Sequence, residues 1–183
     1  MPKQLARALN ERSSEISAGW DKAPNRAHLR AMGLGDAAIG RPWVGISNTW
    51  NTVTPCQLVL RSAAERVRDG IEAAGATAFE FGTITVSDVV AMGHEGMRAS
   101  LVSREVIADS IELMVHAHRY DALVGLGACD KSEPGTIMAM ARLNLPAVYV
   151  YGGTMLPGLY QGRKINMQDV YEGVGAYAAG TLT

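Results

Sequence analysis

The chain has 183 residues, which is enough for one domain with a substantial core or for two small ones. Hydrophobic residues make up 48% and charged residues 19%, which is typical of a folded soluble domain and argues against a disordered chain. With 17 Lys and Arg against 18 Asp and Glu, the net charge is −1, which gives no electrostatic basis for binding nucleic acid or an anionic membrane. We therefore expect a small-molecule substrate as partner, with no nucleic acid and no membrane.

Compartment and redox state follow from two further features. No apolar stretch approaches the roughly 20 residues of a membrane span, and the opening residues lack the apolar segment of a secretion signal. These features predict a cytoplasmic protein, in which a disulfide between Cys56 and Cys129 is the minority interpretation. The 20 glycines, in a sequence without repeats, indicate tight turns and close backbone approach of the kind found at ligand sites.

In chain order, the first forty residues are polar and mixed, and we expect an arm packed on the core with one helix at 26–32. The sequence then alternates between short apolar runs and stretches with apolar residues at helical spacing, which predicts alternating strands and helices. The predicted strands span 43–47, 78–86, 121–127 and 147–151. The predicted helices span 57–74, a segment that begins near Ser103, a segment from Pro134 as first residue to Leu143, and 168–179.

The predicted strands are almost entirely apolar, which indicates a mostly parallel sheet covered on both faces. We therefore expect a three-layer α/β/α domain at 41–183, preceded by the arm at 1–40. Ligands bind beyond the carboxyl ends of parallel strands, where the strand-to-helix loops gather. Those loops contain Cys56, Asp88, the run Cys129-Asp130-Lys131 and the turn Gly152-Gly153. The topology thus predicts that these residues converge on one edge of the sheet.

Two thiols beside two carboxylates suggest a soft-metal centre next to a hard one, because thiolates suit iron–sulfur clusters or zinc and carboxylates suit magnesium. The pattern alone leaves open that Cys56 and Cys129 are small buried residues of the core. The loop after the third strand places a thiol, a carboxylate and an amine in succession. Its structural alternative is a helix cap at Asp130 with Lys131 in solvent.

Other side chains have plainer interpretations. His94 is a candidate acid or metal ligand, but we favour a solvated or hydrogen-bonding role. We expect structural roles for His116 and His118, late in a helix, and core positions for Met138 and Met140. The sequence has no dinucleotide-binding or P-loop glycine pattern, so we do not expect a nucleotide.

Five ordered motifs resemble the dihydroxy-acid dehydratase family, which belongs to a superfamily with sugar-acid dehydratases. They are Asn51-Thr52-x-x-Pro55-Cys56, Val86-Ser87-Asp88-x-x-x-Met92-Gly93-x-Glu95-Gly96-Met97, the run from Ser103 to Ser110, Cys129-Asp130-Lys131-Ser132-x-Pro134-Gly135 and Tyr151-Gly152-Gly153-Thr154. The resemblance runs from about Arg12 to the end of the chain and includes Ala23-Pro24-Asn25-Arg26 in the arm.

By position, the resemblance implies that Cys56 and Cys129 bind an iron–sulfur cluster, and that Asp88, Asp130 and a carbamylated Lys131 bind Mg²⁺. A carbamate turns a cationic amine into an anionic oxygen ligand, and only a lysine that its surroundings deprotonate can react with carbon dioxide. The cluster type stays open between 2Fe–2S, which we favour, and 4Fe–4S.

The resemblance also implies an activity. Family members are hydro-lyases that convert 2,3-dihydroxyisovalerate and 2,3-dihydroxy-3-methylvalerate to 2-oxo acids in valine, isoleucine and leucine biosynthesis. The cluster acts as Lewis acid on the 3-hydroxyl, and magnesium steadies the developing enolate charge. A homodimer is implied as well.

The main departure from the family is length. Family members carry a third cluster cysteine, another magnesium carboxylate and a serine base at positions beyond Thr183, so we expect an amino-terminal portion that holds no catalytic base and is inactive alone. The alternatives are a sugar-acid dehydratase of the same superfamily and a non-catalytic truncated remnant. Gln57, Val89 and Glu133 differ from the usual Asn, Gly and apolar residue, which leaves the ligand set intact and bears on substrate preference.

Overall fold

The computed structural model describes residues 9–182, which divide into two compact units. The first unit ends at Gly153 and contains the main sheet, and the second begins at Thr154. Among residues 9–182, none of the helices combines the length and the apolar character that crossing a bilayer requires.

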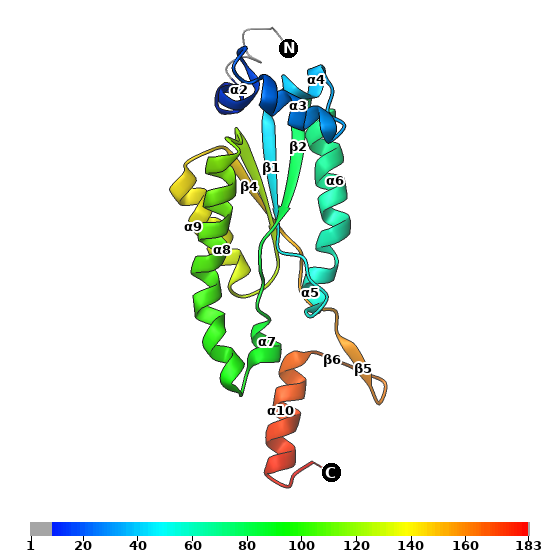
Figure 1. Cartoon of the computed structure of the whole chain (residues 1–183). Helices are drawn as coiled ribbons and strands as arrows, with labels where there is room; N and C mark the ends of the chain where they lie inside the picture. Colours follow the sequence, from blue (N-terminus) through cyan, green and yellow to red (C-terminus); the bar gives the residue numbers. More distant parts are fainter. Residues whose placement is uncertain (1–8, 183) are drawn as a thin grey trace. The chain divides into compact units, whose positions relative to one another are not determined.

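Four parallel strands form the sheet of the first unit (Figure 1). They are β1 (Trp43–Asn48), β2 (Thr77–Gly82), β3 (Ala122–Gly127) and β4 (Ala147–Tyr151), in the spatial order β2-β1-β3-β4. The chain passes from β1 outward to β2 and then crosses to β3 on the other side of β1. The strand order therefore reverses between β1 and β3, and the crevice outside the carboxyl ends of two such strands is where open parallel sheets bind ligands.

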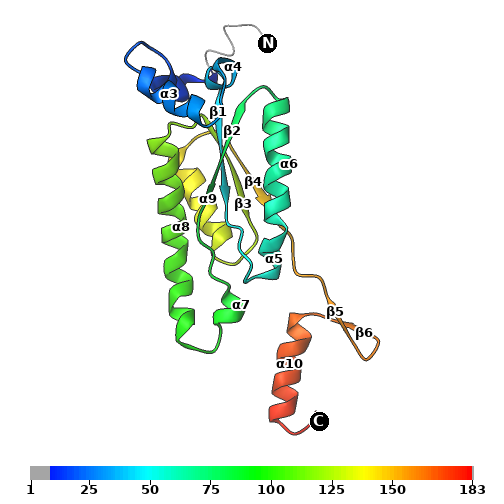
Figure 2. The same ribbon diagram turned by 45° about the vertical axis from the view of Figure 1, so that its right-hand side comes forward.

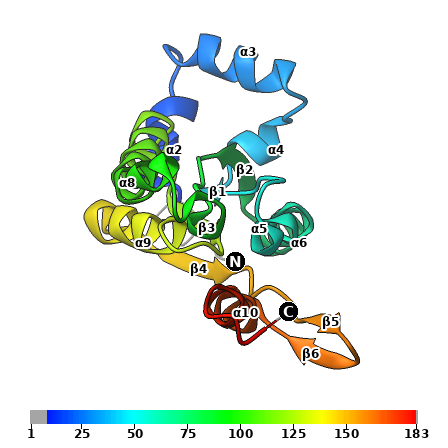
Figure 3. The ribbon, with the colours of Figure 1, turned by 90° about the horizontal axis from the view of Figure 1, so that it is seen from below.

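Helices cover both faces of this sheet (Figure 3), so the predicted α/β/α layering is confirmed. Helix α6 (Leu60–Ala73) lies on one face, and α8 (Arg98–Ala117) and α9 (Ser132–Leu143) lie on the other. The residues of each strand alternate between the faces, since Leu123 packs with the α8 and α9 side chains while its neighbour Val124 packs with those of α6. Met138 and Met140 pack against the first of these clusters, as predicted.

Within residues 9–40, the described part of the arm, there are three helices where one was predicted: α2 (Glu11–Ser17), α3 (Ala23–Ala31) and α4 (Asp36–Ile39). The prediction at 26–32 corresponds to α3, whereas the short α2 and α4 have too few residues to show a helical period. These helices lie at the amino ends of the strands, and α5 (Pro55–Leu58) and α7 (Asp88–Ala91) lie at the opposite end (Figure 2).

Several predicted boundaries differ from the structure. The predicted helix at 57–74 is the pair α5 and α6, and the helix placed near Ser103 begins at Arg98, after a 3-10 turn at Glu95–Met97. The strand predicted at 78–86 ends at Gly82, because its only partner β1 ends at Asn48, opposite Gly82. Pro134 is the third residue of α9 and not the first, a position whose N–H has no partner within the helix in any case.

The second unit holds a hairpin of β5 (Gly158–Tyr160) and β6 (Arg163–Ile165), followed by α10 (Met167–Ala178). The hairpin was not predicted, and its two turn residues, Gln161 and Gly162, both have positive φ, as a tight two-residue turn requires. Helix α10 matches the prediction at 168–179 to within one residue at each end. Asn166 and Asp169 form a reciprocal capping box at its start.

Candidate metal centre

The two cysteines follow β1 and β3, the two strands on either side of the strand-order reversal. Cys56 is the second residue of α5, in the connection after β1, and Cys129 is the second residue after β3. Both are free and half-buried. Burial raises the pKa of the Cys56 thiol, and the nearby Cys129 thiol raises it further. Their partial exposure at the loop edge argues against the interpretation as core residues.

Backbone contacts hold the Cys129 side of this pair. The Cys129 N–H donates to Ser132 Oγ at 3.0 Å, and the thiol lies 3.5 Å from the Val86 carbonyl oxygen. Gly152 directly follows β4 and packs against the Cys56 backbone. A Cβ on Gly152 would lie 3.2 Å from the Cys56 carbonyl oxygen and 2.9 Å from Ala128 Cβ. The glycine of this turn therefore permits close backbone approach beside the thiols.

The carboxylates lie on the same edge. Asp88 is the first residue of α7 and is buried, and it accepts hydrogen bonds from Ser100 Oγ at 2.7 Å and from Lys131 Nζ at 3.0 Å. Lys131 Nζ also pairs with Asp130. The loops after β2 and β3 thus bring Asp88, Asp130 and Lys131 together, as the sequence predicted.

The alternative of an Asp130 cap with a solvated lysine is wrong. Lys131 occupies the cap position of α9, and neither its side chain nor that of Asp130 bonds a helix N–H. The Lys131 side chain is only 18% exposed, because it reaches back to Asp88 instead of extending into solvent.

The electrostatics of this group are those of an ion-paired cluster. Burial alone would raise the pKa of Asp88, but the hydrogen bonds from Ser100 and Lys131 outweigh burial and lower it. The hydrogen bonds to Asp130 and Asp88 raise the pKa of the Lys131 ammonium. A divalent cation between the two carboxylates would act in the opposite direction, since like charge disfavours the ammonium form.

The donor chemistry fits both groups that the resemblance implies, as partial ligand sets. Two thiols suit a cluster or zinc, which use three or four ligands, and carboxylate oxygens suit magnesium. Among residues 9–182, no three His, Cys, Asp or Glu side chains gather as a ready-made metal site. A carbamate on Lys131 would add the third anionic oxygen ligand on the magnesium side.

His94 has the hydrogen-bonding role that we favoured. Its Nδ1 accepts from the Gly96 N–H at 3.0 Å, and its Nε2 lies 2.9 Å from the Val90 carbonyl oxygen. This exposed imidazole thus joins α7 to the following turn. Sequence reasoning missed Ser100, because a serine in the first turn of a long helix carries no sign of a partner twelve residues earlier.

A cavity of about 420 Å³ lies at the opposite edge of the sheet, at the amino ends of the strands. Apolar residues such as Leu9, Val44 and Leu145 dominate its lining, and Asp121 there accepts hydrogen bonds from the backbone of α2 and of Trp43. The cavity is therefore separate from the thiols and carboxylates, and Asp121 in its lining joins the arm to the sheet.

Comparison with known proteins decides the family. Residues 41–183 match the family model described as dihydroxy-acid/6-phosphogluconate dehydratase N-terminal. The chain belongs to this dehydratase family. Among its relatives, dihydroxy-acid dehydratase 2 of Mesorhizobium japonicum is 54% identical over 93% of this chain and 29% of the relative. The dihydroxy-acid dehydratases of Pelagibacter ubique and Metallosphaera sedula are each 51% identical, over 93% and 94% of this chain and 30% and 31% of the relative.

The resemblance stated from the five motifs is thereby confirmed for the dehydratase family. The chain spans 29–31% of the length of these curated relatives. The matched region begins at residue 41, where β1 is about to start and the arm ends.

Proposed function

We propose that this chain is the portion of a dihydroxy-acid dehydratase that carries ligands for an iron–sulfur cluster and for magnesium, with residues 41–183 as the binding domain. The observation that carries the proposal is that Cys56 and Cys129 follow the two neighbouring strands where the strand order reverses, with Asp88, Asp130 and Lys131 on the same edge. The complete enzyme would remove water from 2,3-dihydroxyisovalerate and 2,3-dihydroxy-3-methylvalerate to form 2-oxo acids. Relatives about half identical in sequence bear the name of this activity.

Cys56 and Cys129 would hold the cluster as thiolates, and we favour a 2Fe–2S cluster with its remaining ligands from elsewhere in the complete protein. When bound, the cluster supplies a Lewis acid for the leaving hydroxyl group. The Ser132 hydroxyl, which accepts a hydrogen bond from the Cys129 N–H, would keep this loop at the crevice. Gly152 leaves room for the Cys56 loop.

Asp88, Asp130 and carbamylated Lys131 would hold Mg²⁺ through oxygen atoms. The Ser100 hydroxyl bonds Asp88 Oδ1, which leaves Oδ2 directed at the Lys131 side. By holding Mg²⁺, these side chains would place a cation where the substrate carboxylate and 2-hydroxyl bind. We propose that the base for the C2 proton is a serine contributed by the rest of the complete enzyme, which would act as a cytoplasmic homodimer.

The test uses the complete protein that contains this chain, reconstituted anaerobically with iron, sulfide and Mg²⁺. We expect 2-oxo acid to form from 2,3-dihydroxyisovalerate. Cys56→Ser and Cys129→Ser should lose both visible cluster absorption and activity, whereas Asp88→Asn should keep the absorption and lose the Mg²⁺-dependent turnover. His94→Gln is the control, because His94 is exposed and is not one of the proposed ligands. This variant should retain both the cluster absorption and the activity.

The second candidate is a sugar-acid dehydratase, because the family description names 6-phosphogluconate dehydratases beside dihydroxy-acid dehydratases. The same assay with 6-phosphogluconate and aldonates separates the two, since a sugar-acid enzyme would process these in preference to 2,3-dihydroxyisovalerate. A complete protein that binds neither iron nor sulfide would contradict both candidates and indicate a non-catalytic remnant.

A further inference from the structure

Gln57 is an amide with no exposure to solvent, directly after Cys56. A buried amide costs free energy unless its hydrogen-bonding groups find partners. It is therefore informative to ask which groups this side chain joins, since no step of the proposed chemistry uses it.

The hydrogen-bond pattern settles how the amide is oriented. Thr49 Oγ1 lies 3.0 Å from the Leu126 carbonyl oxygen and 3.0 Å from the end of the Gln57 side chain. The hydroxyl can donate only one hydrogen bond, and the Leu126 carbonyl oxygen accepts it. Toward Gln57 the hydroxyl oxygen is therefore an acceptor, so the amide must present its NH₂ group to Thr49. In that orientation Nε2 donates to Thr49 Oγ1 at 3.0 Å and to the Thr49 carbonyl at 3.3 Å, and Oε1 accepts from the Cys129 N–H at 3.3 Å.

The amide therefore connects three segments. Thr49 follows the last residue of β1, Gln57 is the third residue of the four-residue helix α5, and Cys129 follows β3. The Cys129 N–H is shared between Gln57 Oε1 and Ser132 Oγ. Its hydrogen bonds therefore link α5, which contains Cys56, to the backbone at Cys129.

We propose that Gln57 is a positioning residue that sets the separation of the Cys56 and Cys129 thiols. Helix α5 has only four residues, and the loop before it is partly exposed, so neither determines the position of α5 by itself. The hydrogen bonds of Gln57 to the residues after β1 and β3 therefore determine where Cys56 lies. The role toward a cluster rests on the proposed function, whereas the effect on the two thiols does not. Loss of these hydrogen bonds should increase the distance between the two thiols and its variation, without removing a ligand.

The test uses phenylarsine oxide, which bridges two thiols held close together, on the metal-free complete protein. Gln57→Met keeps the length and approximate volume of the side chain and removes its hydrogen bonds. We expect this variant to bind the arsenical about 10- to 100-fold more weakly than the wild type, the size of effect seen when a residue that orients metal ligands is lost. The same substitution at exposed Gln168 should change nothing.

A second pair of variants covers the case in which Gln57→Met fails to fold. Thr49→Ser keeps the hydroxyl that accepts the hydrogen bond from Gln57. Thr49→Val keeps the shape of the side chain and removes the hydroxyl. We expect Thr49→Val, and not Thr49→Ser, to weaken arsenical binding. After anaerobic reconstitution, the visible spectrum of the cluster should shift or fade faster in Gln57→Met and Thr49→Val than in the wild type and Thr49→Ser.

Two outcomes separate the inference from the function. Equal arsenical affinity in the wild type, a folded Gln57→Met and Thr49→Val would overturn the positioning role while leaving the cluster proposal standing. Failure of the wild type to bind either the arsenical or a cluster would overturn the cluster proposal, and with it the role of Gln57 toward a cluster.

Discussion

At the scale of single residues, the Ser100 hydroxyl determines how Asp88 is presented. Ser100 is 2% exposed, lies in the first turn of α8 and donates to Asp88 Oδ1 at 2.7 Å. Hydrogen bonds of this kind orient a ligating carboxylate and limit the side-chain freedom that is lost when a metal binds. Asp88 is therefore held in its orientation by a residue that would not itself touch the metal.

We expect Ser100→Ala to lower the Mg²⁺ affinity of the complete enzyme about 10- to 100-fold, because Asp88 loses its orienting donor. The Mg²⁺ concentration for half-maximal activity measures this change. Ser103→Ala is the control, since Ser103 is equally buried and its hydroxyl donates to the Ser100 carbonyl at 2.6 Å without contacting Asp88. An unchanged Mg²⁺ requirement in Ser100→Ala would show that Asp88 needs no such support.

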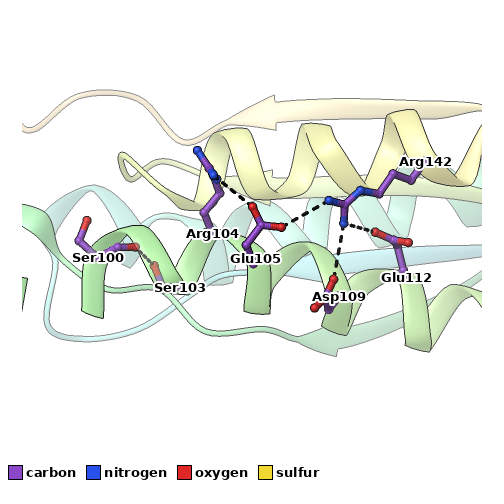
Figure 4. Close-up of polar contacts among 7 residues, drawn as sticks. All are labelled: Ser100, Ser103, Arg104, Glu105, Asp109, Glu112 and Arg142. Carbon is purple, nitrogen blue, oxygen red and sulfur yellow. Dashed lines mark hydrogen bonds and ion pairs between the residues drawn. The ribbon is translucent and has the colours of Figure 1, made fainter. Parts of the chain in front are cut away.

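At the scale of elements, the packing of α8 on α9 relates the two halves of the proposed magnesium site. Helix α8 carries Ser100, and α9 begins directly after Lys131. Figure 4 shows the surface part of this contact, where Arg142 of α9 pairs with three carboxylates of α8 at distances of 2.9 to 3.5 Å. Arg142, Glu105 and Asp109 are exposed, so solvent screens the network and it contributes little to stability. The buried part of the contact, at Gly135, matters more.

Gly135→Ala should lower the free energy of unfolding by about 1–3 kcal/mol, the range for overpacking a close contact. A Cβ there would lie 2.7 Å from the Arg104 carbonyl oxygen and 3.0 Å from Ile107 Cβ, so the helices would have to separate. Urea unfolding measures the change, and the activity of the complete enzyme should fall with it.

The control for that change is Gly70→Ala, in the interior of α6. Nothing lies within 4 Å of a Cβ at Gly70, so this substitution should stabilise the protein by about 0.5–1 kcal/mol through helix propensity alone. Destabilisation of equal size in both variants would refute the close-approach role of Gly135.

At the scale of the whole molecule, the arm contributes to the core of the first unit. Leu29 and Ile39 belong to the same buried cluster as Trp43 and the inner face of α8. Trp43 Nε1 donates to the Ile39 carbonyl at 3.2 Å, and Asp121 accepts from the Arg12 and Ser13 N–H groups at 2.9 and 3.1 Å. The arm is thus joined to the start of the sheet by both apolar and polar contacts.

Ile39→Ala should therefore cost about 2–5 kcal/mol of folding free energy, as expected for a large-to-small change in a core. Ile39 is 4% exposed, and Trp20 in the same arm is 90% exposed. Trp20→Ala should change stability by less than about 0.5 kcal/mol. Denaturant midpoints compare the two, and a similar small loss in both would mean that the arm is only loosely attached.

Stability at alkaline pH should depend on Tyr120, a core residue that is 4% exposed. Burial raises the pKa of its phenol to about 12, above the value of about 10 for the unfolded chain. The folded state favours the neutral phenol, so this contribution is fully present below pH 10 and is lost as pH rises through 12. The loss amounts to about 3 kcal/mol at most.

Unfolding free energies measured from pH 8 to 12 test this expectation. Tyr120→Phe should flatten the decline without abolishing it, because burial also raises the pKa of the Tyr149 phenol. A wild-type curve with no decline above pH 10, or a Tyr120→Phe curve as steep as the wild type, would contradict the assignment.

Most of the fold was predictable from the sequence because strands buried on both faces are apolar along their length and helices on a sheet repeat every three to four residues. The strands at Trp43, Ala122 and Ala147 and the helices between them follow from these periods. The short arm helices α2 and α4 and the β5–β6 hairpin did not follow, because segments of three to seven residues are too short to show a helical or an alternating period. Helices α2 and α4 contact residues far along the chain, namely Asp121 for α2 and Thr77 for α4.

The candidate site, too, could be predicted only in part from the sequence. Residue types and their place after strands were sufficient, with the resemblance, to select Cys56, Asp88, Cys129, Asp130 and Lys131, because side chains at the carboxyl ends of parallel strands share an edge. Only the tertiary structure decided that β1 and β3 are neighbours, that Lys131 turns back to Asp88, and that Ser100 and Gln57 orient the site. Strand order and hydrogen bonds between residues far apart in the chain arise from packing of the whole sheet, which no local pattern records.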